Sequence, residues 1–157
     1  MAYNETFMQR AIELSIRNID EGEGPFGAVI VKNGNIIAEG GNRVTADNDP
    51  SAHAEMVVIR KAGKELGTFD LSGCEIYSSC EPCPMCLGAI YWAHINTVYY
   101  GNTKFDAEEI GFDDLFIYDE IINLTQEERY VKSKQYLSEK AIVTFEKWSQ
   151  KGDKQMY

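Results

Sequence analysis

Apolar residues recur every three or four positions near the start of the chain, at Phe7, Ala11 and Leu14. This spacing places them on one face of a helix, which is typical of a helix that packs against the rest of a protein. Asn4 is a residue type that caps helix N-termini, and two glycines follow Asp20 closely. We therefore predict a packing helix from Asn4 to about Asp20.

Two short strands are predicted next. Residues 26–32 are mostly apolar and β-branched, and residues 36–40 form a second such run. Asn33-Gly34 lies between them, and this pair is a strong hairpin signal because both residues tolerate the positive φ angles of a type I′ turn. The pattern predicts an antiparallel hairpin.

Helices and strands alternate after this hairpin. Asp49-Pro50 predicts a helix start with Asp49 as the cap, and the apolar pattern that follows ends at Gly67. Residues 75–79 predict a third strand that runs into a helix over residues 83–92, and residues 97–100 predict a fourth strand. Strands joined by crossover helices lie parallel, so we predict an α/β fold.

The last third of the chain has a weaker pattern. It favours a turn with a short helix over residues 110–116 and a second helix over residues 138–150. The final residues, 151–157, are polar apart from the last two, and such an end is normally frayed. No repeat or linker interrupts the sequence, so we expect a single domain over residues 1–157.

Length and composition fit that expectation. A chain of 157 residues with 44% hydrophobic residues can build one sizeable core but not two ordinary domains. No apolar run is long enough to cross a membrane, and the polar first six residues do not resemble a signal peptide. We expect a cytoplasmic protein without membrane contact, because reduced thiols suit that compartment.

The net charge of −10 argues against nucleic acid as the main partner, because affinity for it depends on neutralising phosphates. The charge is also uneven. Residues 105–128 contain acids and no Lys or Arg, whereas residues 129–154 contain seven basic side chains. These stretches are either two solvated faces, the commoner case, or a basic tail that packs near the acidic stretch of its own subunit or a partner.

Metal-binding residue types cluster in two places, His53-Ala54-Glu55 and Cys80-Glu81-Pro82-Cys83-Pro84-Met85-Cys86. Cys83 and Cys86 are three residues apart and share one face of a helix. The prolines around Cys83 fit only in or before a first helical turn, so they place Cys83 at a helix N-terminus. The helix dipole there favours the thiolate, which is the form that binds metal.

This arrangement matches the signature of zinc-dependent nucleobase deaminases, H-x-E followed by P-C-x-x-C. Three protein ligands, His53, Cys83 and Cys86, would leave a fourth position for water, as in catalytic zinc sites. A four-cysteine structural site with Cys74 and Cys80, or a redox pair, would explain the cysteines alone. Neither explains the His-x-Glu sequence, so we expect Cys80 to be a strand-end thiol and Cys74 a buried one.

The chain resembles the cytidine deaminase-like superfamily and, most closely, the small bacterial guanine deaminases. The likeness covers most of residues 4–121. It is carried by Gly24-Pro25-Phe26-Gly27-Ala28-Val29, Asn42, Asp49-Pro50, His53-Ala54-Glu55, Cys80 to Trp92, Gly111-Phe112-Asp113-Asp114 and the terminal Tyr157. The zinc signature is specific for the superfamily but not for the base, whereas the Gly-Phe-Asp-Asp stretch and the terminal Tyr favour guanine.

The resemblance implies a three-layer α/β/α fold around a mixed five-stranded sheet. It also implies a homodimer in which the C-terminal segment, about residues 125–157, is exchanged between subunits. The implied activity is hydrolysis of guanine to xanthine and ammonia with one zinc ion and its bound water per chain. His53, Cys83 and Cys86 would bind the zinc, and Glu55 would move protons between water and base.

The resemblance also implies which residues contact the base. Asn42 and Asp114 correspond to base-recognising positions and Tyr157 to a residue that closes the pocket; Phe26, Ala54 and Trp92 complete the predicted set. All of these except Ala54 have a plainer interpretation: Asn42 as a strand-end cap, Asp114 as a helix cap that could exchange roles with Asp113, the aromatic residues as core, and Tyr157 as an exposed terminus.

Three other functions compete with guanine deamination. A tRNA adenosine deaminase carries the same zinc signature, and the basic residues after Arg129 keep that alternative open despite the net charge. Cytosine deaminase or another deaminase of free bases or nucleosides shares the signature too. A non-catalytic zinc-stabilised interaction module is the third, and the intact Glu55 argues against it.

Overall fold

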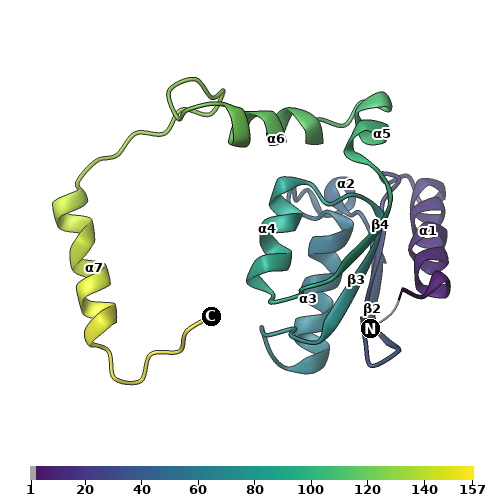
Figure 1. Ribbon diagram of the computed structural model, residues 1–157, viewed down its shortest axis with the longest axis horizontal. Coiled ribbons are helices and arrows are strands. Elements are labelled where there is room, and N and C mark those ends of the chain that lie inside the picture. Colours follow the sequence, from purple (N-terminus) through teal and green to yellow (C-terminus); the bar gives the residue numbers. More distant parts are fainter. Residues whose placement is uncertain (1–2) are drawn as a thin grey trace. The chain divides into compact units, whose positions relative to one another are not determined.

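The computed structural model describes residues 3–157. Over these residues the chain forms four strands and seven helices and divides into two units, the first ending at Tyr118 and the second spanning Asp119–Tyr157 (Figure 1). In chain order the elements are α1 (Glu5–Asp20), β1 (Gly27–Lys32), β2 (Asn35–Gly41), α2 (Val44–Asp47), α3 (Ala54–Leu66), β3 (Cys74–Cys80), α4 (Pro84–Trp92), β4 (Val98–Asn102), α5 (Lys104–Glu109), α6 (Asp114–Asn123) and α7 (Ser138–Gln150).

The four strands form one mixed sheet in the order β2-β1-β3-β4. Strand β1 pairs antiparallel with β2 and with β3, and β3 pairs parallel with β4 across the crossover helix α4. Asn33 and Gly34, between β1 and β2, have φ angles of 52° and 76°, which a type I′ turn requires. The alternation of elements thus predicted the parallel β3–β4 pair correctly.

The described residues contain four strands, one fewer than the resemblance implied. After β4 the chain enters a helix instead of another strand. Thr103 and Asp106 form a capping box there: each side chain accepts a hydrogen bond from the other residue's backbone N–H. This pairing satisfies the free amides at the start of α5, so the sequence after Asn102 favours a helix.

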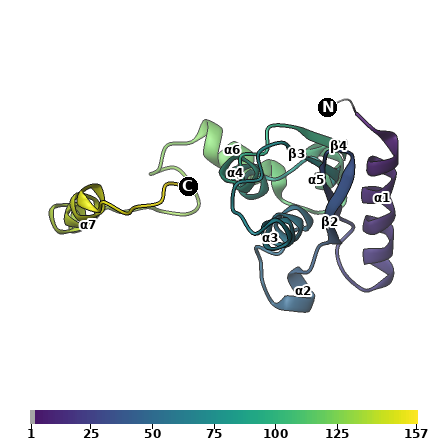
Figure 2. The ribbon, with the colours of Figure 1, turned by 90° about the horizontal axis from the view of Figure 1, so that it is seen from below.

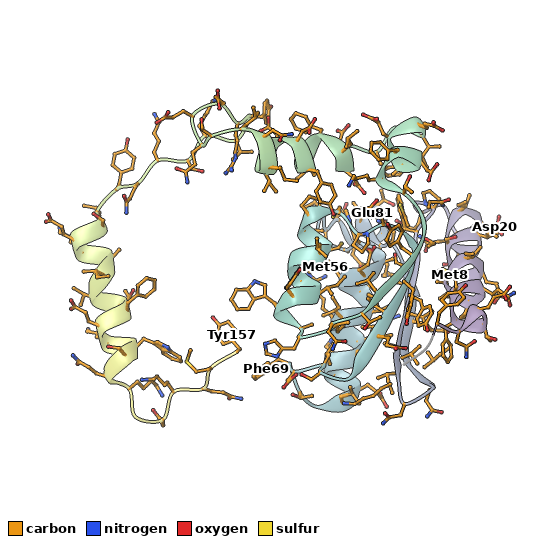
Figure 3. All side chains as sticks on the ribbon, in the orientation of Figure 1. Met8, Asp20, Met56, Phe69, Glu81 and Tyr157 are labelled. Carbon is orange, nitrogen blue, oxygen red and sulfur yellow. The ribbon has the colours of Figure 1, made fainter. Side chains whose placement is uncertain are left out.

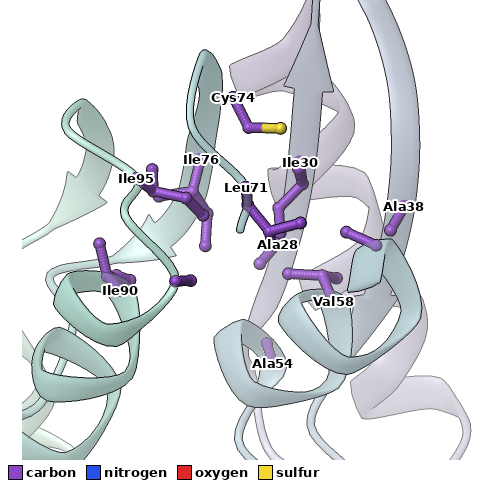
Figure 4. Packing of buried hydrophobic residues seen from close by; sticks show 12 residues of the cluster. Ala28, Ile30, Ala38, Ala54, Val58, Leu71, Cys74, Ile76, Ile90 and Ile95 are labelled. Atoms are coloured by element: carbon purple, nitrogen blue, oxygen red, sulfur yellow. The ribbon is translucent and has the colours of Figure 1, made fainter. Parts of the chain in front are cut away.

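Helices cover both faces of the sheet, with α1 on one side and α3 and α4 on the other (Figures 1 and 2). The alternation of side chains along β1 builds both cores, because successive residues point to opposite faces. Ala28 and Ile30 belong to the cluster under α3 and α4 (Figure 4), whereas Val29 and Val31 join the cluster under α1. Met8 of α1 reaches into that second cluster (Figure 3).

The start of the helix predicted after Asp49-Pro50, which corresponds to α3, was wrong by several residues. Asp49 does not cap α3, which begins at Ala54 with His53 in the N-cap position. Instead, the Asp49 carboxylate accepts hydrogen bonds from the backbone N–H and the hydroxyl of Ser51, at 2.8 and 2.7 Å. Asp forms this two-residue turn as readily as a helix cap, so the local sequence does not distinguish the two.

The second unit contains the end of α6, an irregular stretch and α7. Arg129 donates hydrogen bonds to the backbone carbonyls of Glu120 and Ile121, and so satisfies acceptors in the last turns of α6. Helix α7 occupies the residues that its apolar pattern predicted, yet none of its residues is buried. Within residues 3–157, no helix is both long and apolar enough to span a bilayer.

Candidate active site

The three predicted metal ligands come from the beginnings of two helices. His53 is the N-cap residue of α3, Cys83 is the N-cap residue of α4, and Cys86 lies in the first turn of α4. Pro84 is the first residue of α4, where a proline loses no helical hydrogen bond. Two helix N-termini, each with partial positive charge, therefore point to one place and favour anionic sulfur there.

The geometry of this group fits a zinc ion. The sulfur atoms of Cys83 and Cys86 each lie 3.6 Å from Nδ1 of His53, and the ligand atoms all lie within 4.8 Å of one another. A tetrahedral ion at usual zinc bond lengths would separate sulfur from nitrogen by about 3.6 Å. Thiolate and imidazole are the ligands zinc prefers, and three of them leave one position open for a substrate or water.

The two ligand cysteines differ in their affinity for protons. The pKa of Cys83 falls to about 4, chiefly because the Cys86 thiol donates a hydrogen bond to its sulfur. The pKa of Cys86 rises, because it is the donor in that hydrogen bond and is buried. Metal binding needs both sulfur atoms as thiolates, so a bound metal would displace any proton that the pair holds.

Cys74 and Cys80 are not in this ligand group. Cys80 is the last residue of β3, and its thiol lies 3.7 Å from the carbonyl oxygen of Thr103. Burial raises the pKa of Cys80 to about 12, so its sulfur stays protonated. Cys74 is buried in the core under α3 and α4. These are the positions expected for a strand-end thiol and a buried thiol.

Glu55 is buried two residues after His53, with 6% of its surface exposed. The hydroxyl of Ser78, on the adjacent strand β3, donates a 2.9 Å hydrogen bond to Oε1 of Glu55. Burial raises the pKa of this carboxyl. A raised pKa suits a buried carboxyl group that takes up and releases protons.

The metal group opens into a cavity of about 360 Å³, at the small end of the range for ligand pockets. Among the described residues that line it, three carry carboxylates and none is Lys or Arg. The lining comprises Gly24, Phe26, Asn42, Val44, Thr45, Pro50, His53, Glu55, Cys80, Glu81, Cys83, Phe112 and Asp114. A wall of this charge favours a neutral ligand that donates hydrogen bonds and disfavours a phosphate.

Asn42 lies in this lining directly after β2. Its Oδ1 accepts a 3.0 Å hydrogen bond from the backbone N–H of Val44, and the backbone N–H of Asn42 donates to the carbonyl of Phe26. The backbone-capping interpretation of Asn42 therefore holds for its side-chain oxygen. This hydrogen bond orients the side chain, and the amide nitrogen of Asn42 is the atom that can donate to a ligand in the cavity.

Asn18 of α1 is a buried contributor that the sequence analysis missed. Its amide nitrogen donates to the carbonyls of Gly24 and Asn42, at 2.7 and 3.0 Å, and so ties together two segments that line the cavity. A Cβ atom on Gly41 would lie 2.2 Å from Oδ1 of Asn18, so glycine is required there. The available signal was its position four residues after Leu14, a polar residue on the buried face of the helix.

Two of the predicted base contacts, Phe26 and Asp114, lie in the cavity wall. Phe26 lines the cavity, and its ring meets that of Phe112 edge to face at 4.7 Å. Asp114, the first residue of α6, also lines the cavity, and burial raises the pKa of its carboxyl. Asp113 is absent from the described lining.

Ala54, Trp92 and Tyr157 are not among the described residues that line this cavity. Ala54 is fully buried in the core under α3 and α4. Trp92 is 65% exposed at the end of α4, so it is not the core aromatic that the plainer interpretation expected. Tyr157 is the last residue of the second unit and is 73% exposed.

The zinc-binding region of cytidine and deoxycytidylate deaminases matches residues 1–102. The guanine deaminase of Bacillus subtilis is 51% identical over 155 residues, which cover 98% of this chain and 99% of that protein. A solved structure of guanine deaminase from Bacillus subtilis superposes with a TM-score of 0.94 at 50% identity, over 99% of both chains. The tRNA-specific adenosine deaminase of Bacillus subtilis is 40% identical over 83% of this chain and 76% of that one.

Proposed function

The chain belongs to the cytidine and deoxycytidylate deaminase family, and from this premise we propose that it is a zinc-dependent hydrolase that converts guanine to xanthine and ammonia. One observation carries the assignment of substrate. The carboxylate of Asp114 shares a small cavity, lined by no Lys or Arg among the described residues, with the His53, Cys83 and Cys86 group. A carboxylate accepts hydrogen bonds from the N–H groups of guanine.

When bound, zinc supplies an activated water by lowering the pKa of that water from about 16 towards 7. Glu55, which Ser78 orients by a hydrogen bond to Oε1, would take up a proton from water at its carboxylate. It then gives the proton to a ring nitrogen of the base and assists the departure of ammonia from C2. The atoms balance, because one water enters and its oxygen replaces the amino group.

Recognition of the base is assigned to Asn42 and Asp114. With Oδ1 held by Val44, the Asn42 amide can donate to an acceptor of the base. Asp114 can accept from N–H groups of the base, and it lines the cavity whereas Asp113 does not. Phe26 supplies an apolar wall beside them. A site that pairs a donor and an acceptor in this way rejects bases that lack either partner.

The tRNA deaminase alternative is disfavoured by charge. That activity needs a surface that neutralises phosphates, and the chain carries a net charge of −10. The deciding experiment is ammonia release by the zinc-loaded protein from guanine, cytosine, adenine and their nucleosides, with tRNA binding measured in rising salt. We expect turnover of guanine alone and no salt-sensitive tRNA binding. Turnover of adenosine in tRNA but not of guanine would overturn the proposal.

We further propose that the active form is a homodimer in which about residues 125–157 are exchanged between subunits. The second unit is too short to build a core of its own, and many of its apolar side chains are exposed. These are Ile121, Ile122, Tyr130, Val131, Tyr136, Leu137, Ile142, Val143, Phe145, Trp148, Met156 and Tyr157. Light scattering should report twice the mass of one chain, and an active monomer would refute the dimer.

Tyr157 is proposed to close the pocket over the bound base. Tyrosine combines an apolar ring that can wall in a base with a hydroxyl that can hydrogen-bond to it. Closure would also keep bulk water away from the reacting base. The compartment is proposed to be the cytoplasm, because all four cysteines are free thiols and two of them must stay reduced to bind zinc. The proposed role there is purine breakdown.

A further inference from the structure

Helix α6 attaches to the segment that precedes Cys83 through Tyr118, in the second turn of the helix. The hydroxyl of Tyr118 donates a 2.6 Å hydrogen bond to the backbone carbonyl of Pro82, the residue before the ligand Cys83. Tyr118 lies four residues after Asp114, so both side chains project from the same face of the helix. Tyr118, which binds the Pro82 carbonyl, and Asp114, which lines the cavity, are therefore connected by one turn of the same helix.

The aromatic ring of Tyr118 takes part in a second interaction, with Lys104. The ammonium group of Lys104 lies 4.7 Å from the ring centre, within range of a cation–π contact. The same ammonium lies 3.4 Å from Oε1 of Glu81, next to Pro82 in the chain. The Tyr118 ring is thus held on its face by Lys104 and at its hydroxyl by Pro82.

Helix α6 is not held in place by buried apolar side chains, because none of its residues is buried. On the other side of Asp114, the ring of Phe112 meets Phe26 edge to face. Asp114 consequently lies between two attachments, Phe112 before it and Tyr118 after it. Because Asp114 shares the cavity with the carboxylates of Glu55 and Glu81, such attachments also hold it against repulsion between like charges.

We propose that Tyr118 is a positioning residue that holds Asp114 in the cavity by binding the Pro82 carbonyl. This deepens the proposed function, on which it rests, because it assigns to the start of α6 the task of presenting the acceptor that selects the base. Tyr118 itself does not line the cavity. Its effect on catalysis passes through Asp114.

The test is Tyr118→Phe, which removes the hydroxyl and keeps the ring over Lys104. Tyr100→Phe, the same change on a half-exposed ring of β4, is the matched control. We expect kcat/KM for guanine to fall about 3- to 10-fold in Tyr118→Phe, the factor that corresponds to one typical hydrogen bond. The loss should appear mainly in KM, with zinc content and Tm unchanged. Loss of zinc would overturn the proposal, since Tyr118 would then support the metal loop.

A double-mutant cycle with Asp114→Asn decides whether Tyr118 acts through Asp114. In that background, Tyr118→Phe should cost less than about 2-fold, because the residue it positions no longer accepts hydrogen bonds in the same way. If the loss of kcat/KM in the double variant equals the product of the losses in the two single variants, Tyr118 acts independently of Asp114. That result would overturn the proposal.

Amide hydrogen exchange tests the positioning role of Tyr118 independently of whether guanine is the substrate. Tyr118→Phe should speed exchange in residues 110–118 relative to wild type and Tyr100→Phe, and leave α3 unchanged. A wild-type protein that does not deaminate guanine would refute the proposed function but leave this measurement valid. Unchanged exchange in residues 110–118 would refute the positioning role even if guanine is the substrate.

Discussion

Replacing Glu55 by Gln tests the proton-transfer step. The amide matches the carboxylate in shape and keeps an oxygen that can accept the 2.9 Å hydrogen bond from Ser78. It also removes a buried charge, whose desolvation is unfavourable. Because Glu55 is outside the metal-binding group, zinc content and Tm are expected to stay at or above wild-type values.

Turnover of guanine is expected to fall by about 10²–10⁴-fold, the usual contribution of general acid–base catalysis. This corresponds to about 2.7–5.4 kcal/mol in the activation free energy. The structure places the loss at the upper end, because no neighbour can easily take over. Of the other two cavity carboxylates, Glu81 is paired with Lys104 and Asp114 is assigned to the base. In the proposed mechanism, Glu55 alone therefore handles the proton transfers.

The assay is ammonia release from guanine by zinc-loaded protein, with zinc measured on the same samples. Glu65→Gln makes the same chemical change on the exposed surface of α3 and should retain full activity. Near-normal turnover of Glu55→Gln at full zinc occupancy would refute the assignment, since another group would then have to move the protons. Loss of zinc from this variant would show instead that Glu55 belongs to the metal site.

Three further predictions concern the metal, the base and the tail. Cys83→Ala should lose most of its zinc by elemental analysis, whereas Cys80→Ser should keep it, because only Cys83 lies in the ligand group; equal zinc in both would contradict the ligand assignment. Asp114→Asn should reduce kcat/KM for guanine far more than Asp113→Asn at equal zinc content, since Asp114 alone of the two lines the described cavity; the reverse order would move the role to Asp113. Removing residues 155–157 should sharply lower kcat/KM while Tm stays nearly constant, and mixing this chain with Glu55→Gln should restore part of the activity if the tail comes from a partner. Unchanged kinetics after truncation would rule out a closing role for Tyr157.

Much of the fold and the metal site was predictable because the signals are local. Asn33-Gly34 between two apolar runs, the stripe through Ala11 and Leu14, and the prolines around Cys83 each determine the structure of their own segment. The start of α3 was not predictable in this way, because Asp49 forms a tight turn with Ser51 as readily as a helix cap.

Contacts between distant segments were beyond reach of the sequence patterns. Asn18 binds carbonyls 6 and 24 residues away, and Tyr118 binds one 36 residues away. Both interactions end on backbone carbonyls, which every residue possesses, so no residue type marks the acceptor. Buried Ser78 was equally invisible, since its partner Glu55 lies 23 residues earlier on another element.

The ligand positions have a consequence for folding. His53 is separated by 30 residues from Cys83 and by 33 from Cys86, and strand β3 lies within that interval. An ion held at both ends closes this stretch of chain into a loop, as a cross-link does. A covalent cross-link that closes a loop of this length raises the free energy of the unfolded chain by about 3 to 4 kcal/mol at 25 °C. This value sets the scale for the contribution of the ion.

That free energy is comparable to a large part of the stability of a domain this size. A chelator should therefore behave as a mild denaturant, and thermal shift should track free zinc concentration logarithmically. Because an ion held by this group would join the N-termini of α3 and α4 around strand β3, its removal would loosen both helices on one face of the sheet together. The described residues of the cluster under α1 include none of the three predicted ligands, so this face of the sheet should keep its structure longest during chelation.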